Sequence, residues 1–201
     1  MILSDRRLLK KLPEIILHNA QGQNRPLRLM FQDEARFGRI SDPRSCWAPK
    51  DCRPEVQVQI IREYTYVFAA VSPHDGTLDS LILPEVNAQI MSIFLAEVAA
   101  RHPKEFIVMF MDQAAWHKAN DLQLPENMCL LWLPPYSPQC NPTEHIWDEI
   151  REKWFANRVF GSLDAVEDTL FEALVDLEKD NEKISNLTGF DWIVSISLNA
   201  T

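Results

Sequence analysis

The sequence predicts a globular α/β domain in which helices cover the faces of a mixed β-sheet. Two observations predict this class. Strand-like segments dominate the first half of the chain, and helix-like and strand-like segments alternate after them. In addition, 46% of the 201 residues are hydrophobic and 24% are charged, which supplies enough apolar material for one core and excludes general disorder.

The first half is predicted to begin with an amphipathic helix over 5–19 and then to be mostly strand. Alternating apolar residues bounded by turn residues indicate each strand. The expected strands are 27–34, a short strand at 45–50, and a hairpin formed by 64–72 and 77–83.

In the second half, each expected helix begins at a residue that favours a helix N-terminus. Asn87 caps a helix over 87–101, Ser162 precedes a helix over 163–179, and Asn141 with Pro142 opens a helix that runs to about 158. Between them, apolar runs predict strands at 106–112 and 128–134.

Charge is distributed unevenly along the chain. The net charge is -9, but residues 1–62 hold 12 Lys and Arg against 7 Asp and Glu, so an acidic protein can present a basic face. No apolar run approaches the roughly 18 residues of a membrane helix. The start of the chain lacks the order of a signal peptide and the four cysteines form no CxxC pair, so reduced thiols in a cytosol are expected.

Three acids stand at positions where an isolated acid is uncommon. Asp33 and Asp112 each end an apolar strand, and Glu144 lies in the first turn of a predicted helix. If the two strands are neighbours, both aspartates emerge at one edge of the sheet, where open α/β sheets place their sites. The alternative for each aspartate is a turn cap. Glu144 could equally be a capping-box residue, three positions after Asn141.

Clustered carboxylates without basic neighbours are expected to raise one another's pKa, and a hard divalent cation between them relieves the repulsion. Mg²⁺ prefers such oxygen ligands, and two ions about 4 Å apart can clamp both oxygens of a phosphoryl displacement. The acids therefore indicate metal-dependent phosphodiester chemistry, although the chemistry alone leaves the capping alternatives open.

Five segments together resemble the DDE transposases, in particular the catalytic half of bacterial insertion-sequence transposases related to the mariner superfamily. They fall in family order, and the proline-rich one is the most specific. The segments are FQDEARFG (31–38), CWAPK (46–50), FMDQAAWHK (110–118), LPPYSPQCNPTEHIWDEIREKWF (133–155) and NLTGFDW (186–192).

This resemblance implies an RNase H-like fold, as in retroviral integrase, with a mixed five-stranded sheet flanked by helices. It implies that Asp33, Asp112 and Glu144 are the catalytic, metal-binding acids, and that the cofactor is a pair of Mg²⁺ or Mn²⁺ ions. The expected organisation is an N-terminal helix and linker at 1–25, a catalytic core at 26–160 and an acidic helical extension at 161–201.

The implied activity is cut-and-paste transposition: hydrolysis at the ends of a DNA element and strand transfer to target DNA. Two alternatives are a nuclease of the same fold without strand transfer, and a non-catalytic fragment that dimerises with a complete transposase. Only 26 residues precede the first expected strand, which leaves no room for the family's helix-turn-helix region. The expected partners are DNA and either a second copy or a chain that carries such a region, in the bacterial cytoplasm at the nucleoid, with no membrane.

Further residues are expected around the acids. A basic run after the first strand fits a DNA backbone, although solvated surface arginines are the alternative. His117 could contact a phosphate or be a surface histidine, and Arg151 could contact DNA or pair with Glu144. The expected DNA-binding residues are Arg36, Arg39, Lys50, His117, Lys118 and Arg151, and the expected supporting residues are Glu34, which points away from Asp33, and Trp116 and Trp147.

Overall fold

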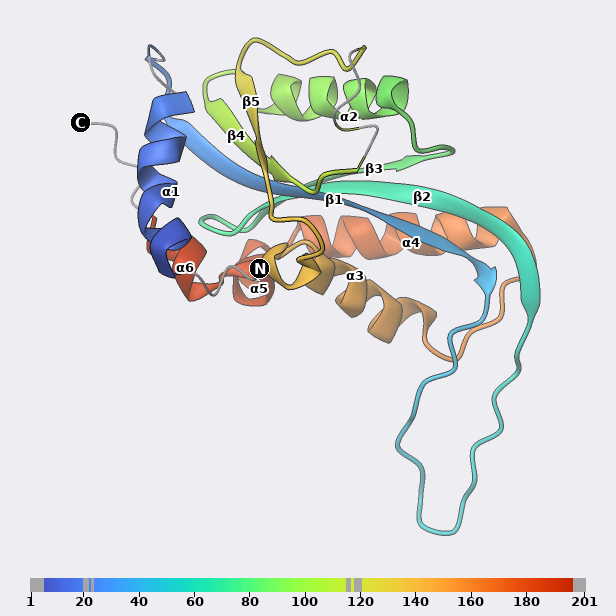
Figure 1. The fold of residues 1–201 in the computed structure, drawn as a ribbon. Coiled ribbons are helices and arrows are strands. Elements are labelled where there is room, and N and C mark those ends of the chain that lie inside the picture. The colour runs from blue at the N-terminus through green and yellow to red at the C-terminus, as the bar shows by residue number, and fades with distance from the viewer. Residues whose placement is uncertain (1–5, 20–21, 23, 115–116, 118–120, 197–201) are drawn as a thin grey trace.

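A twisted five-stranded sheet forms the centre of the molecule. The computed structural model describes residues 6–19, 22, 24–114, 117 and 121–196 (Figure 1). The strand order is β3-β2-β1-β4-β5, with β1 antiparallel to β2, β2 antiparallel to β3, and β4 parallel to both β1 and β5. The predicted mixed five-stranded sheet is therefore confirmed. The strands are β1 (Leu27–Ile40), β2 (Ile60–Ser72), β3 (Thr77–Leu83), β4 (Phe106–Met111) and β5 (Met128–Trp132).

Helices cover both faces of this sheet. Helix α2 lies on one face, and α3 and α4 lie on the opposite face (Figure 1). The helices are α1 (Arg6–Asn19), α2 (Ala88–Arg101), α3 (Glu144–Ile150), α4 (Leu163–Glu178), α5 (Asn181–Thr188) and α6 (Asp191–Val194). Within the described residues, no helix is long and apolar enough to cross a membrane.

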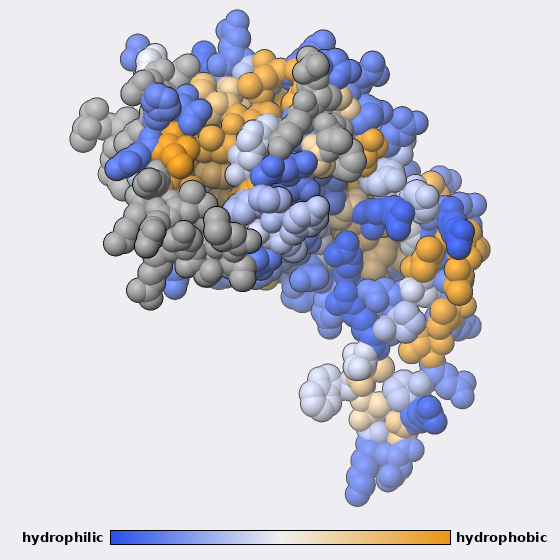
Figure 2. All heavy atoms as spheres, in the orientation of Figure 1, coloured by the Kyte–Doolittle hydropathy of each residue, from blue (hydrophilic) through white to orange (hydrophobic). Residues whose placement is uncertain are grey.

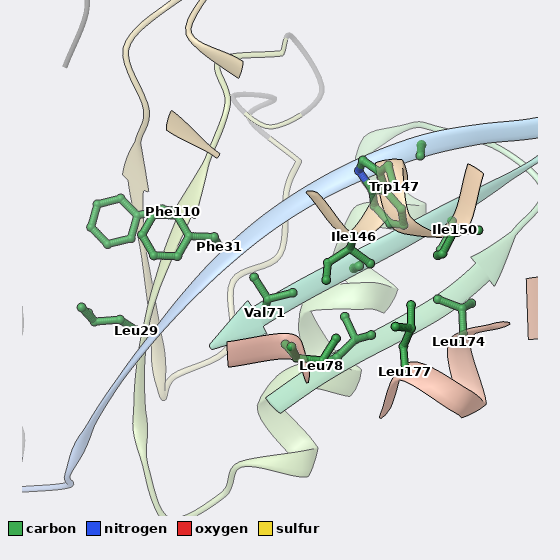
Figure 3. Close-up of a cluster of buried hydrophobic side chains, with 14 of the residues drawn as sticks. Leu29, Phe31, Val71, Leu78, Phe110, Ile146, Trp147, Ile150, Leu174 and Leu177 are labelled. Atoms are coloured by element: carbon green, nitrogen blue, oxygen red, sulfur yellow. The ribbon is translucent and has the colours of Figure 1, made fainter. Parts of the chain in front are cut away.

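Two hydrophobic clusters sandwich the sheet because successive side chains of a strand point to opposite faces. On the α3–α4 side, Phe31 and Phe110 stack with ring centroids 4.8 Å apart, and α3 adds Trp147. Figure 3 shows these side chains with Leu174 and Leu177 of α4 beneath the same face. The α2 side is filled by a second cluster whose members include Met30, Phe68, Phe94 and Met109.

The capped helices and the second strand of the hairpin match the sequence prediction closely. Asn87 Oδ1 accepts a hydrogen bond of 2.9 Å from Ile90 N, and Ser162 Oγ accepts one of 3.1 Å from Ala165 N. These two bonds set the starts of α2 and α4. Local capping chemistry was sufficient to locate both helices.

The region between β1 and β2 differs from the prediction. The short strand expected at 45–50 is wrong: residues 41–59 form an arm that extends away from the body, and Trp47 in it is fully exposed (Figures 1 and 2). A strand needs a pairing partner, and the arm offers none there. Conversely, β1 runs six residues beyond the expected end, because its pairing with β2 continues to Ile40 opposite Ile60.

Candidate active site

The two aspartates emerge side by side because β1 and β4 are parallel neighbours. Phe31 pairs with Phe110 in the ladder, and Asp33 and Asp112 each follow two residues later. Both acids therefore project from the face that carries Phe31 and Phe110, which α3 covers. The adjacency that the sequence argument required is present.

Glu144 reaches the same place because the start of α3 is tied to the backbone of β1. Thr143 Oγ1 donates a 2.7 Å hydrogen bond to the carbonyl of Phe31, and Asn141 Nδ2 donates a 2.9 Å bond to that of Gln32. The helix begins at Glu144, later than predicted, because Asn141 and Thr143 are used for these ties. The backbone N–H of Asn141, from which a capping-box Glu144 would accept, instead donates a 2.8 Å hydrogen bond to the carbonyl of Pro138, so the capping-box alternative is not the arrangement found.

The three acids line one open pocket of about 480 Å³. Its opposite wall is the proline-rich loop after β5, in which Tyr136 adopts a left-handed backbone (φ 55°) and is fully exposed. A tyrosine in this region of backbone space is uncommon, and rigid prolines on both sides hold it there. The remaining lining residues are Gln113, Ala114, Leu133, Pro134, Pro135, Ser137, Pro138 and Asn141.

Asp33 is the most perturbed acid in the pocket. Its Oδ2 accepts a 2.9 Å hydrogen bond from Trp147 Nε1, which Figure 3 shows turned toward β1. Burial, and then the negative charge of Glu144, raise the pKa of Asp33 to about 8. Trp147, expected as a supporting residue, is buried and holds this carboxylate of the pocket.

Asp112 behaves in the opposite way. His117 Nδ1 lies 2.8 Å from its Oδ1, and Ala114 N donates a 2.9 Å hydrogen bond to the same carboxylate. The bond from His117, which outweighs desolvation, lowers the pKa of Asp112. The predicted mutual rise in pKa assumed that no basic group lies beside the acids, and this condition fails for Asp112, because His117 lies against it.

His117 is held from behind by Glu34. The imidazole is 1% exposed, and its Nε2 lies 2.8 Å from Glu34 Oε1. Burial alone would lower the pKa of His117, but its bonds to Asp112 and Glu34 raise it to about 9. The surface-histidine alternative is wrong. Glu34 does not line the pocket, as alternation along β1 predicted, yet it reaches Asp112 through the imidazole.

Glu144 completes the pocket as a half-buried acid. Burial is the main cause that raises its pKa, and the charges of Asp148 and Asp112 add to this effect. Arg151, seven residues further along, acts against them and favours the ionised form. Arg151 also places its guanidinium carbon 5.3 Å from the centroid of the Phe37 ring.

The donor set fits a hard divalent cation in its chemistry, since all three side chains supply carboxylate oxygens and two of them have raised pKa values. As placed, however, no three His, Cys, Asp or Glu side chains in the described part of the chain are close enough to hold a metal ion together. Trp147 contacts one oxygen of Asp33, and His117 contacts one oxygen of Asp112.

The predicted DNA-binding residues have different surroundings. Lys50 is exposed on the arm, and Arg36 is exposed on β1 with its guanidinium 4.6 Å from the centroid of the Tyr64 ring. Arg39 is already bonded to Glu63 at 2.7 Å and to the carbonyl of Phe160 at 3.0 Å. Trp116 and Lys118 lie outside the described residues.

Sequence reasoning missed Thr143 and Tyr136 as parts of the site. The tie from Thr143 to β1 depends on a contact 112 residues apart, which no local pattern reports. For Tyr136, the flanking prolines were a signal for a rigid loop, but the positive φ could not be read from them.

A comparison with protein-family models gives a match over residues 28–167 to the family described as DDE superfamily endonuclease. Among curated proteins, the chain is 36% identical over 104 residues to the uncharacterized protein y4pE/y4sA of Sinorhizobium fredii (strain NBRC 101917 / NGR234). The matched region is 51% of this chain and 77% of that protein.

Among solved structures, the fold is similar to that of the Mos1 mariner transposase. The Mos1 strand transfer complex matches with a TM-score of 0.59 at 16% identity, over 96% of this chain and 61% of the Mos1 chain. The isolated Mos1 catalytic domain matches with a TM-score of 0.53 at 15% identity, over 96% of this chain and 94% of that domain. The chain thus spans about three fifths of the Mos1 chain in that complex, and the likeness is one of fold.

Proposed function

This chain belongs to the DDE superfamily endonucleases, and from that premise we propose that it is the catalytic domain of a cut-and-paste DNA transposase. It hydrolyses phosphodiester bonds at the ends of a DNA element and transfers the freed 3′ strand to target DNA. The observation that carries the proposal is the convergence of Asp33, Asp112 and Glu144, from three separate elements, on one pocket in a Mos1-like fold.

In this proposal Asp33, Asp112 and Glu144 would hold two Mg²⁺ or Mn²⁺ ions. Solved Mos1 paired-end complexes contain Mn or Mg, and the carboxylates here match that preference for oxygen ligands. When bound, such ions activate water and neutralise charge on the reacting phosphate. No covalent bond between protein and DNA is part of the proposal.

The chain's own contribution is positioning. Trp147 fixes one oxygen of Asp33, and His117, supported by Glu34, fixes one oxygen of Asp112. Thr143 and Asn141 fix the start of the helix that carries Glu144. An enzyme that accelerates a reaction by positioning its reacting groups needs such rigid supports, because a small displacement of these groups lowers the rate by a large factor.

DNA is the proposed substrate and partner, at both element ends and target. The Mos1 structures include a complex with the left transposon end. Arg36, Lys50, Lys118 and Arg151 remain proposed DNA contacts. We leave out Arg39, whose guanidinium is bonded within the protein, and His117, which is buried between two carboxylates.

We further propose that the chain works as a homodimer or with a partner that carries a helix-turn-helix domain, at the nucleoid of a bacterial cytoplasm. Element ends are recognised by sequence, and such recognition needs base contacts in a groove. The proposed contacts here are arginines and lysines, which bind the backbone without reading sequence.

Incubation of the purified chain with Mn²⁺ and pre-nicked element ends, taken from the DNA that flanks the gene, tests the activity. We expect cleavage and joining, both abolished by Asp112→Asn or Glu144→Gln and retained by Asp168→Asn, which removes an exposed acid of α4. Cleavage without joining would instead favour a nuclease, and no reaction would favour a regulatory fragment.

A further inference from the structure

The pocket that holds the three acids has a second wall of opposite character. We call the pocket that Asp33, Asp112 and Glu144 line the acidic pocket. Its other wall is formed by residues 133–138, which are leucine, prolines, tyrosine and serine, and none of the described residues that line the pocket is a lysine, an arginine or a histidine. A wall without positive charge does not attract a phosphate, whereas apolar and aromatic groups suit the face of a base. The acidic pocket therefore has a carboxylate half and a neutral half.

Tyr136 presents an uncovered aromatic ring in the neutral half. The residue is fully exposed, and within the described part of the chain its side chain has no hydrogen bond and no ring contact. Its left-handed backbone (φ 55°) costs free energy that an uncovered ring does not return to the fold. Backbone strain of this kind clusters at ligand-binding sites. Tyr136 is therefore placed for binding and not for stability.

Hydrogen bonds at both ends of this loop fix the ring relative to the acids. At its start, Leu133 N donates a 2.8 Å hydrogen bond to the carbonyl of Met111, the last residue of β4. At its end, Asn141 Nδ2 donates a 2.9 Å hydrogen bond to the carbonyl of Gln32 in β1. These two carbonyls immediately precede the two aspartates of the pocket. The loop is thus tied to both strands that carry the aspartates, and its prolines limit the remaining freedom of the backbone.

A base can stack on the ring of Tyr136 only outside a regular double helix. Inside duplex DNA each base is paired and stacked, so a protein group reaches its face only when the nucleotide leaves the stack. The acidic pocket measures about 480 Å³, within the range of sites that bind one small organic ligand, and a single nucleotide is a ligand of that class. The size of the pocket therefore suits one unpaired nucleotide.

We propose that Tyr136 stacks on an unpaired base beside the phosphodiester that the acids process, so that the site selects DNA ends with an unpaired strand. The inference rests on the proposed function, since it takes DNA as the substrate. Stacking on an aromatic side chain tolerates every sequence, because each base has a π face. Tyr136 therefore selects the state of the DNA end and not its sequence.

Two substitutions separate the ring of Tyr136 from the backbone that carries it. Tyr136→Phe keeps an aromatic ring, whereas Tyr136→Asn removes the ring and supplies a residue that tolerates a left-handed backbone. The matched control is Phe171→Ala, which removes another exposed aromatic side chain, on α4 and outside the pocket. Thermal unfolding should show that Tyr136→Asn is at least as stable as the wild type, because the ring it removes is uncovered.

Fluorescence anisotropy measures the affinity for a labelled 20-base-pair duplex that is either blunt or carries a three-nucleotide 3′ overhang. The buffer contains Ca²⁺, which takes oxygen ligands as Mg²⁺ does. We expect the wild type, Tyr136→Phe and Phe171→Ala to bind the overhang duplex about tenfold more tightly than the blunt one. Tyr136→Asn should lose this preference and keep its affinity for the blunt duplex. Its slope of log K against log salt should equal that of the wild type, because no phosphate contact is removed.

Equal affinity of the wild type for the two duplexes, no binding of either, or a preference that Tyr136→Asn retains would each overturn the inference. A preference that Phe171→Ala also loses would overturn it as well. Cleavage and joining in Mn²⁺ are scored separately. A wild type that cleaves and joins without preferring the overhang refutes the role of Tyr136 alone, and one that prefers the overhang through Tyr136 but never cleaves refutes the transposase proposal alone.

Discussion

At the scale of single residues, the carboxylates of the acidic pocket have opposite electrostatic surroundings. Asp33 is half-buried and faces Glu144, and burial and then the charge of Glu144 raise its pKa to about 8 against the hydrogen bond that Trp147 donates. The hydrogen bond from the cationic imidazole of His117 lowers the pKa of Asp112. Repulsion in the metal-free protein is therefore concentrated at Asp33 and Glu144, while Asp112 is already satisfied by protein donors.

This asymmetry predicts opposite effects of two matched substitutions. Asp33→Asn should raise the free energy of unfolding at pH 7: the span from the ordinary pKa of 3.8 to pH 7 is worth about 4 kcal/mol, and relaxation of an open site leaves roughly 2 kcal/mol. Asp112→Asn should lower it by less than about 1 kcal/mol, because that side chain is 56% exposed and solvent screens its ion pair. Urea unfolding without metal measures both.

The gain from Asp33→Asn should depend on pH with a definite sign. A carboxyl whose pKa is higher in the folded protein destabilises the fold as it ionises. Below about pH 4 the variant and the wild type should therefore have equal free energies of unfolding. As the pH rises toward 8, the free energy of unfolding of the variant should exceed that of the wild type by a growing amount. A gap that is constant across this range would contradict the electrostatic account and leave a packing effect.

Glu34 is linked to Asp112 through His117, so a substitution at Glu34 tests whether the buried imidazole positions the Asp112 carboxylate. Glu34→Gln keeps the size of the side chain but weakens the hydrogen bond to the imidazole of His117. The Asp112 carboxylate should then be less well oriented. Loss of an outer partner of a metal ligand commonly costs 10–100-fold in metal affinity. We expect about tenfold weaker Mn²⁺ binding by calorimetry with an unchanged fold. Unchanged affinity would show that the buried imidazole is only structural.

At the scale of elements, β1 connects every part of the candidate site. Its first half pairs with β4 and places Asp33, its backbone carbonyls receive Thr143 and Asn141, and its second half brings Gly38 against the backbone of β2. The strand can be this long because β2 pairs with it across a register shift after Gly38. The geometry of the acidic pocket therefore depends on one strand.

Two glycine substitutions test the close approach in that strand. Gly38→Ala should destabilise the protein by about 2–3 kcal/mol, because its Cβ would lie 2.8 Å from Tyr64 Cβ and against rigid backbone of β2. Gly161→Ala is the control, since nothing lies within 4 Å of a Cβ there. It should be neutral or gain up to about 1 kcal/mol through a less flexible unfolded chain. Denaturant midpoints at equal m-values decide between these outcomes, and a harmless Gly38→Ala would refute the close packing.

At the scale of the whole molecule, an acidic chain can respond to divalent cations through a specific site or through general screening. Residues 161–201 hold 9 Asp and Glu against 2 Lys, so screening is a real alternative. The acidic pocket differs from this extension because its carboxylates come from β1, β4 and α3 and are partly buried. A cation bound there stabilises the native state only.

Thermal unfolding at constant ionic strength separates the two responses. With a Kd near 1 mM, 10 mM Mg²⁺ should stabilise the wild type by about 1.4 kcal/mol, a rise in Tm of roughly 3–6 °C for a domain of this size. Asp112→Asn, which lacks one ligand, should shift much less, while Asp168→Asn in the acidic extension should shift as the wild type does. Equal shifts in all three proteins would mean that Mg²⁺ screens charge and fills no site at Asp112.

The sequence by itself determined a mixed sheet covered by helices, the starts of α2 and α4 at Asn87 and Ser162, and the candidate acids Asp33, Asp112 and Glu144, while the number of five strands came from the resemblance to the DDE transposases. These features are encoded locally, in the periodicity of apolar residues, in capping side chains and in short motifs, so they can be read without knowing what packs where.

Only the tertiary structure decided that His117 is buried between Glu34 and Asp112, that residues 45–50 form no strand, and that Thr143 and Asn141 tie the start of α3 to β1. Each of these features depends on groups far apart in the chain. A pKa depends on the burial and charge that neighbouring elements impose, and a strand exists only where another strand pairs with it. Local patterns carry no record of those distant partners, which is why the residues of the site were predictable and their electrostatic roles were not.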